Sequence, residues 1–229
     1  MLNGTIMNTV NETKRKAFQK LYADEEILPW TTKEALDESL PLIIDFIKKN
    51  NIHIGSLLDY GAGTCHFAIA LKQMLGIPKV VAVDFTENCA NKEELAHSGV
   101  EFVVADRPEK VGGKYDAILC WTVLHSINPE LHKEYLAQFA KMLNDNGVLL
   151  LSAFSSEDKA FAGKASMTSA YSGLPLYAGV LESDQICKDA GFETVETGSA
   201  IQPLGESDRM RKMGISYRSL QCRFLRKAG

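Results

Sequence analysis

Three acidic residues and a glycine-containing loop follow apolar segments of the sequence, where they could bind a ligand. Asp59 precedes a loop with Gly61 and Gly63, Asp84 ends a second apolar segment, and Asp106 follows a third. Glycine lets the backbone adopt positive φ angles and approach a ligand closely. An acid about 20 residues after such a loop is typical of a group that binds the two hydroxyls of a ribose. The spacing therefore predicts a cofactor that contains a nucleoside.

Two cofactor classes compete for this pattern. A dinucleotide-binding loop has a third glycine where this chain has His66. The carboxylate of Asp59 would also repel a pyrophosphate and offset the attraction of the helix N-terminus that follows. S-adenosylmethionine carries an ammonium and a sulfonium group and no phosphate, so the loop favours this cofactor. A nicotinamide-dependent oxidoreductase is the less favoured alternative.

Seven β-branched or apolar segments alternate with segments of helical spacing. The predicted strands are residues 56–60, 79–84, 100–105, 115–121, 147–154, 192–197 and 217–225. Helical spacing occupies residues 67–75 and 131–143 between the first five strands. The alternation predicts an α/β fold with an open, doubly wound, Rossmann-like sheet of seven strands.

In an open α/β sheet, ligands bind outside the carboxyl ends of the strands. The three acids, and the segment from Trp121 to His125 after the fourth strand, are therefore expected at one edge of the sheet. We predict a single domain with a helical cap in residues 1–51, a cofactor-binding half in residues 52–154, and a lid and substrate side in residues 155–229. Helices at residues 12–22 and 33–49 are expected to cap the carboxyl edge.

Five sequence segments together resemble the class I S-adenosylmethionine-dependent methyltransferases, over residues 52–154. They are LLDYGAGTC, VVAVDFTENC, VEFVVAD, KYDAILCWTVLHSI and LNDNGVLLLSAF, in the family's order and spacing. The resemblance implies that Asp59, Gly61 and Gly63 shape the methionine pocket. It also implies that Asp84 holds the ribose hydroxyls and Asp106 contacts the adenine amino group. For the fold, it implies a mostly parallel sheet with an antiparallel last strand.

Phe85 and Trp121 are included among the expected cofactor-binding residues. The chain departs from the family at Cys65, where the third glycine of the loop usually stands. The layout is also similar to small-molecule methyltransferases of the tellurite-resistance and thiopurine-methyltransferase-like groups. That similarity makes a small molecule the expected methyl acceptor.

Aromatic residues outside the cofactor half are candidates for the substrate pocket. Trp30, Tyr171 and Tyr177 could stack on a substrate, although aromatic residues in a cap also serve as packing anchors. His125 is a weak candidate for a general base, with shaping of its loop as the alternative. Arg209, Arg211 and Lys212 are interpreted as a solvated basic surface.

The sequence contains no catalytic triad, pair of acids or metal-binding pattern. Methyl transfer from a sulfonium needs chiefly the alignment of a nucleophile in a dry pocket, so a dedicated base is not required. A non-catalytic protein that binds S-adenosylmethionine for regulation is the second alternative. It would retain the acids but lack a substrate cavity.

The composition excludes several other classes of protein. The 229 residues include 45% hydrophobic and 24% charged residues, and the formal net charge is -4. This is ordinary globular usage and does not favour nucleic acid as a partner. Five scattered cysteines, no signal-like start and no apolar stretch of about 20 residues lead us to expect a cytoplasmic protein without a membrane partner. The sequence does not indicate an oligomeric state.

Overall fold

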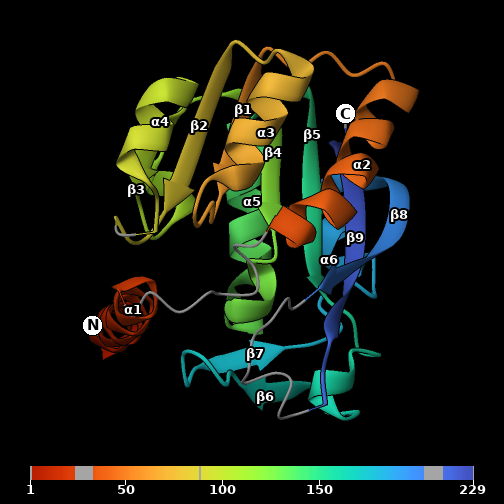
Figure 1. Ribbon diagram of the computed structural model, residues 1–229. Coiled ribbons are helices and arrows are strands. Elements are labelled where there is room, and N and C mark those ends of the chain that lie inside the picture. The colour runs from red at the N-terminus through yellow and green to blue at the C-terminus, as the bar shows by residue number, and fades with distance from the viewer. Residues whose placement is uncertain (1, 24–32, 88, 204–213, 229) are drawn as a thin grey trace.

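The computed structural model describes residues 2–23, 33–87, 89–203 and 214–228 (Figure 1). Three positions singled out in the sequence for their charge, Arg209, Arg211 and Lys212, lie outside the described residues. The same is true of Trp30, which is a substrate-pocket candidate.

A seven-stranded sheet forms the centre of the molecule, in the order β3-β2-β1-β4-β5-β9-β8 (Figure 1). β9 runs antiparallel to both β5 and β8, and the other neighbouring strands pair in parallel. The strands are β1 (Ser56–Tyr60), β2 (Lys79–Asp84), β3 (Glu101–Val104), β4 (Tyr115–Trp121), β5 (Leu143–Phe154), β8 (Phe192–Pro203) and β9 (Tyr217–Lys227). The predicted fold class, including the antiparallel last strand, is confirmed.

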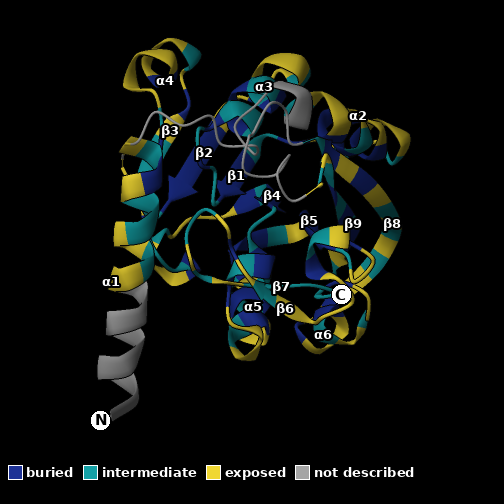
Figure 2. Ribbon diagram, turned by 60° about the horizontal axis from the view of Figure 1, so that its bottom comes forward, coloured by how far each residue is buried: buried dark blue, intermediate teal, exposed yellow. Residues whose placement is uncertain are grey.

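Helices cover both faces of this sheet, so there are two hydrophobic cores. α2 (Lys33–Lys49), α3 (His66–Leu75) and α4 (Lys92–Ser98) contribute to one core, which includes Leu57 and Leu119. α5 (His132–Met142) and α6 (Gln185–Asp189) contribute to the other, which includes Leu58 and Ile118. Neighbouring residues of one strand enter opposite cores because side chains alternate along a strand. Figure 2 shows β2 buried while the outer surfaces of α2, α3 and α4 are exposed.

The two N-terminal helices have different positions. α1 (Leu2–Ala23) lies beyond the carboxyl ends of the parallel strands, where Lys14 and Phe18 contact Ser126 and Phe85 (Figure 1). α2 instead packs on the sheet, and its Phe46 stacks on a phenylalanine of β9. Of the two helices predicted to cap the carboxyl edge, α1 lies there, whereas α2 reaches the edge at Leu36 in its first turn and otherwise packs its apolar face on the sheet.

The segment between β5 and α6 has more structure than a loop. It contains a single turn, η5 (Lys159–Phe161), and a two-stranded antiparallel sheet of β6 (Ser166–Thr168) and β7 (Pro175–Tyr177). Figure 1 shows this small sheet beyond the carboxyl ends of the parallel strands. Three further 3-10 turns are η2 (Pro108–Lys110), η3 (Leu124–Ser126) and η4 (Pro129–Leu131). Within the described part of the chain, no helix has both the length and the apolar character needed to span a membrane.

Replacing Phe46 with alanine tests the packing of α2 on the sheet. The Phe46 ring is 1% exposed, and its centre lies 4.5 Å from the centre of the Phe224 ring. We expect the free energy of unfolding to fall by about 3–5 kcal/mol, the usual cost of deleting a buried aromatic side chain. Urea denaturation measures this change. Met74→Ala, at a side chain that is 62% exposed, is the control and should cost less than about 0.5 kcal/mol. Equal losses for both variants would contradict this packing.

Candidate functional site

A pocket lies at the carboxyl edge of the sheet and collects side chains from distant parts of the chain. It is lined by the loops after β1, β2, β3 and β4, by α1, by the segment after β5, and by β8 and β9. The residues predicted for the site that line it are Asp59, Gly61, Gly63, Asp84, Phe85, Asp106, Trp121, His125 and Tyr171. The structure therefore brings together all the predicted cofactor residues and one substrate candidate.

The glycine loop after β1 is held by the end of β2. The N–H groups of Gly61 and Ala62 both donate to the carbonyl oxygen of Val83, at 2.7 and 2.9 Å. Gly61 has a φ of +76°, and a Cβ placed there would lie 2.4 Å from Cγ2 of Val123. Because no side chain fits at this position, the backbone itself forms the surface of the pocket.

Cys65 takes the place of the third loop glycine without opening the loop. Its φ of 65° lies in the left-handed region, and it precedes the first turn of α3. The side chain is buried, and burial raises the pKa of the thiol well above its usual value. Cys65 is therefore a neutral thiol and a packing residue.

Asp84 joins the loops that follow β1 and β2. Its Oδ2 atom accepts a hydrogen bond from the N–H of Gly63 at 3.0 Å. Its Oδ1 atom accepts from the N–H and the hydroxyl of Thr86, at 3.1 and 3.2 Å. Burial raises the pKa of Asp84, and the hydrogen bonds from Thr86 and Gly63 oppose this rise. The carboxylate is thus fixed in the pocket wall.

Asp59 is a buried acid with an unused hydrogen-bond acceptor. The residue is 3% exposed, and its Oδ2 atom has no hydrogen-bond partner among the described residues. Burial raises the pKa of Asp59 to about 7, a hydrogen bond from the backbone of Ala68 opposes the rise, and the charge of Asp84 adds to it. A cation that enters the pocket would favour ionisation of this carboxyl group.

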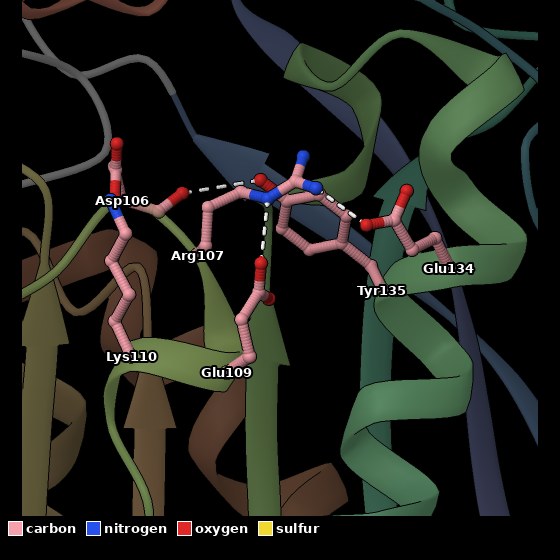
Figure 3. Close-up of polar contacts among 6 residues, drawn as sticks. All are labelled: Asp106, Arg107, Glu109, Lys110, Glu134 and Tyr135. Carbon is pink, nitrogen blue, oxygen red and sulfur yellow. Dashed lines mark hydrogen bonds and ion pairs between the residues drawn. The ribbon is translucent and has the colours of Figure 1, made fainter. Parts of the chain in front are cut away.

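Asp106 belongs to a polar cluster between the end of β3 and α5 (Figure 3). Its carboxylate accepts a hydrogen bond from Lys110 at 2.6 Å, and its backbone carbonyl accepts one from the hydroxyl of Tyr135 at 3.2 Å. Burial raises the pKa of Asp106, but the hydrogen bond and charge of Lys110, together with a backbone hydrogen bond and the charge of Arg15, bring the pKa below its usual value. The neighbouring Arg107 forms ion pairs with Glu109 and Glu134. These contacts fix Asp106 at the pocket edge as a carboxylate.

The turn after β4 is strained and carries two buried polar side chains. Thr122 has a φ of 56°, which is rare for a residue with a branched side chain, and its N–H donates to Oγ of Ser152 at 2.9 Å. Nε1 of Trp121 and Nδ1 of His125 have no partner in the described part of the chain. Such strain and unpaired groups are concentrated at functional sites. This turn therefore belongs to the site rather than only to its support.

His125 lies flat against Phe154, with the two ring centres 3.8 Å apart. The residue is 7% exposed, and burial lowers its pKa well below the usual value, with the charge of Arg218 and other cations adding to the effect. The imidazole is therefore neutral near pH 7. A neutral imidazole can accept a hydrogen bond, but a low pKa makes it a weak base.

α1 contributes three side chains to the pocket that the sequence analysis did not identify. Phe18 packs edge-on against Phe85, and Tyr22 also lines the pocket. The ammonium group of Lys14 donates to the carbonyl and hydroxyl oxygens of Ser126, at 3.0 and 3.2 Å. Burial lowers the pKa of Lys14 to about 8, with the charge of Asp84 opposing the shift. α1 therefore covers the loops after β2 and β4.

The small sheet and the last two strands form another wall of the pocket. Of the residues in this wall, the sequence analysis identified only Tyr171. Met167 of β6 and Leu176 of β7 are direct register partners and both line the pocket, as do Gln202 and Arg218. The structure does not bring the substrate candidate Tyr177 into this pocket. Side chains alternate along a strand, so with Leu176 facing the pocket Tyr177 lines a separate shallow depression.

Residues 31–197 match the model of a family described as a methyltransferase domain. No curated protein sequence gives a significant match. The narrower similarity to tellurite-resistance and thiopurine methyltransferases is not confirmed by these comparisons.

Three solved structures share the fold over almost the whole chain. The 1,6-didemethyltoxoflavin-N1-methyltransferase of Burkholderia thailandensis, with 1,6-didemethyltoxoflavin and S-adenosylhomocysteine bound, is 21% identical, with 97% of this chain and 90% of that chain covered and a TM-score of 0.72. A SAM-dependent methyltransferase from Anabaena variabilis is 14% identical, with 95% of both chains covered and a TM-score of 0.68. The magnesium protoporphyrin IX methyltransferase of Synechocystis, with S-adenosylhomocysteine bound, is 17% identical, with 98% of this chain and 99% of that chain covered and a TM-score of 0.63.

Gly61→Ala tests the contact between the glycine loop and the turn after β4. The matched control is Gly76→Ala, because Gly76 also has a positive φ, of +64°, but has no atom within 4 Å of an added Cβ. We expect the control to cost about 1–2 kcal/mol from backbone strain. Gly61→Ala should cost about 1–3 kcal/mol more because its methyl group meets Val123. Thermal unfolding measures both, and equal losses would show that the loop is not confined by that contact.

Proposed function

Because the chain belongs to the methyltransferase-domain family, we propose that it transfers the methyl group of S-adenosylmethionine to a small molecule bound in the pocket at the carboxyl edge. The observation that carries this proposal is a carboxylate oxygen of buried Asp59 that has no hydrogen-bond partner among the described residues, beside a loop where Gly61 leaves no room for a side chain. A buried acid without a partner is costly, and a bound cation relieves that cost.

The residues present fit S-adenosylmethionine better than a nicotinamide dinucleotide. The cofactor's ammonium group would be held by Asp59, and its ribose hydroxyls by Asp84, which already faces the glycine loop. Asp106 would accept a hydrogen bond from the adenine amino group, beside Phe85. The pyrophosphate of a dinucleotide would instead approach Asp59, whose carboxylate would repel it.

The bound cofactor supplies an electrophilic methyl group on its sulfonium. The chain's own contribution is alignment and the exclusion of water, for which proximity alone can provide roughly 7–11 kcal/mol. α1 covers the pocket through Phe18, and Trp121, Met167 and Leu176 give it apolar walls. Neutral His125 can accept a hydrogen bond from the methyl-accepting molecule and thereby orient the lone pair that this molecule uses to attack the methyl group. No strong base is needed for an acceptor whose lone pair is already free.

A small molecule is the acceptor that the pocket favours. The residues proposed for the cofactor come from the loops after β1 to β4, whereas the pocket continues to β8 and β9. A regulatory protein that only binds S-adenosylmethionine would need no such extension. The net charge of -4 offers little attraction to nucleic acid. A cytoplasmic location stays part of the proposal.

Titration of the protein with S-adenosylhomocysteine tests the proposed cofactor. We expect one-site binding of this compound and no binding of NAD or NADP by calorimetry. Asp84→Asn should weaken binding by about ten- to a hundredfold, because hydrogen bonds to a charged group contribute about 1.5–3 kcal/mol each. The matched control is Asp116→Asn, at a carboxylate that accepts hydrogen bonds from Gly55 and Ser56 and does not line the pocket. Tighter binding of a nicotinamide cofactor, or an unchanged Asp84→Asn variant, would contradict the proposal.

The pH dependence of the same titration tests the role of Asp59. The ionised carboxylate attracts the ammonium group, so affinity should be full above pH 7 and should fall as the pH drops through about 7. Between pH 8 and pH 5 the loss should approach about 100-fold, which is the fall in the ionised fraction of a group with this pKa. Asp59→Asn should bind more weakly at pH 8 and show a flat profile. A pH-dependent profile in that variant would assign the titration to another group.

The raised pKa of Asp59 also makes the stability of the cofactor-free protein depend on pH. The folded-state pKa of Asp59, about 7, lies above the usual value of 3.8, so the folded protein binds the proton more tightly. Its contribution to stability is therefore present at low pH and is lost as the pH rises from about 4 to about 7. Asp59→Asn should lack this loss, and urea denaturation of the cofactor-free protein at pH 5 and pH 8 provides the check.

A further inference from the structure

Arg218 is a buried cation on the side of the pocket away from the proposed cofactor residues. It lies on β9, two residues before Leu220 in the sequence. Leu220 pairs with Phe154, the last residue of β5, so Arg218 lies past the carboxyl end of β5. Three strand spacings separate β1 from β9 in the sheet, which amounts to about 14 Å. Gln202 lies directly opposite Arg218 on β8, and both side chains line the pocket. This end of the pocket therefore belongs to the methyl acceptor.

The guanidinium of Arg218 is fixed in one orientation. Its Nε donates to both carboxylate oxygens of Asp158, at 3.0 Å each. Asp158 is itself held by the N–H groups of Ser219 and Ala160, at 2.6 and 3.0 Å. The guanidinium carbon lies 3.6 Å from the centre of the Phe154 ring. Packing and hydrogen bonds thus leave this side chain little freedom.

Phe154 lies between Arg218 and His125. The ring centres of His125 and Phe154 are 3.8 Å apart and the ring planes differ by 24°, so His125 covers one face. Two groups this close to one ring centre cannot share a face, so the guanidinium covers the other. The result is a stack of three flat groups, in which the imidazole and the guanidinium carry nitrogen atoms at their edges.

One nitrogen of this guanidinium is unpaired. Nη2 of Arg218 is buried and has no hydrogen-bond partner among the residues that the structure describes, and the residue as a whole is 6% exposed. A guanidinium can donate hydrogen bonds but cannot accept them. A buried donor left unpaired is unfavourable, so a ligand group with a lone pair is the natural partner.

The ion pair also restricts the charge of that ligand group. Asp158, 1% exposed, already neutralises Arg218 within the wall of the pocket. A second carboxylate on the same guanidinium would leave a net negative charge in a buried site, which is costly. A carbonyl oxygen accepts a hydrogen bond and brings no charge. The site therefore favours a neutral hydrogen-bond acceptor, such as a carbonyl oxygen, over a carboxylate.

We propose that Arg218 selects the methyl acceptor, by donating a hydrogen bond from Nη2 to a carbonyl oxygen on the edge of a flat, uncharged ring system. This inference rests on the proposed function, because it takes the cofactor to occupy the other end of the pocket. Met167 and Leu176 provide apolar surface for the ring faces, and Gln202 offers a second polar group beside Arg218. Arg218 is a specificity residue that binds substrate and transfers no proton.

Matched ring compounds test this assignment in the protein saturated with S-adenosylhomocysteine. The probes are quinazoline-2,4-dione, naphthalene and naphthalene-1-carboxylate, which are flat bicyclic compounds that carry carbonyl groups, no hydrogen-bond acceptor, and a charged carboxylate, respectively. We expect the dione to bind at least tenfold more tightly than either of the others by calorimetry. In Arg218→Lys this preference should fall below threefold, because a single ammonium nitrogen cannot occupy both the position of Nε beside Asp158 and the position of Nη2.

The control is Arg223→Lys. Arg223 lies on the same strand, is also 6% exposed and pairs with Asp184, but does not line the pocket. This variant should keep the tenfold preference, and both variants should bind S-adenosylhomocysteine like the parent. The inference is overturned by an unchanged preference in Arg218→Lys, by tighter binding of the carboxylate, or by the absence of binding of all three probes. Failure to bind S-adenosylhomocysteine would instead overturn the proposed function.

The same inference can be tested by nuclear magnetic resonance on the unaltered protein, so that the test does not require the Arg218→Lys variant to fold. The nitrogen-15 resonances of buried arginine side chains report on their hydrogen bonds. Addition of the dione should shift the Arg218 signals, while naphthalene at the same occupancy, which has no hydrogen-bond acceptor, should leave them unmoved. The Arg223 signals should stay constant with both compounds. Equal shifts of Arg218 with the two compounds would overturn the inference.

Discussion

The hydrogen bonds between the glycine loop and the end of β2 determine where the rest of the site lies. Gly61 and Ala62 both donate to one carbonyl of β2, and Gly63 donates to the carboxylate that ends this strand. The pairing of β1 with β2 thereby continues beyond the end of β1 and sets the starting point of α3. Contact with Val123 then fixes the turn after β4 against the same loop. Three loops from three strands behave as one rigid surface.

Much of the sheet and of the proposed cofactor site could be predicted from the sequence, because both depend on local patterns. A parallel strand covered on two faces requires a nearly continuous apolar segment, and the ends of such strands meet at one edge. This reasoning placed Asp59, Asp84 and Asp106 in one pocket. The residues at which the later strands begin were harder to predict, as β5 shows. β5 begins at Leu143 because that residue pairs with Tyr115, across a register shift that no local pattern encodes.

The residues that were missed depend on contacts between distant segments. Lys14 reaches Ser126, 112 positions away, and nothing near it in the sequence indicates that partner. Tyr177 was misplaced because its direction follows from a short strand that the sequence analysis treated as loop. Arg218 did leave a signal. It shares one face of its strand with Leu220, Cys222 and Phe224, all of them buried, and a charge at such a position requires a buried partner.

The place of β9 in the sheet has a consequence for how the chain reaches its folded state. β9 follows β8 in the sequence, yet it lies between β5 and β8. While the chain is being synthesised, the five preceding parallel strands can assemble first, and β5 then presents an open, strongly apolar edge. β8 cannot cover that edge alone, since among the strands that the structure describes it pairs only with β9. Until the β8–β9 hairpin docks, the nascent protein is exposed to strand pairing with other chains, and this is the stage at which a chaperone would have the most effect.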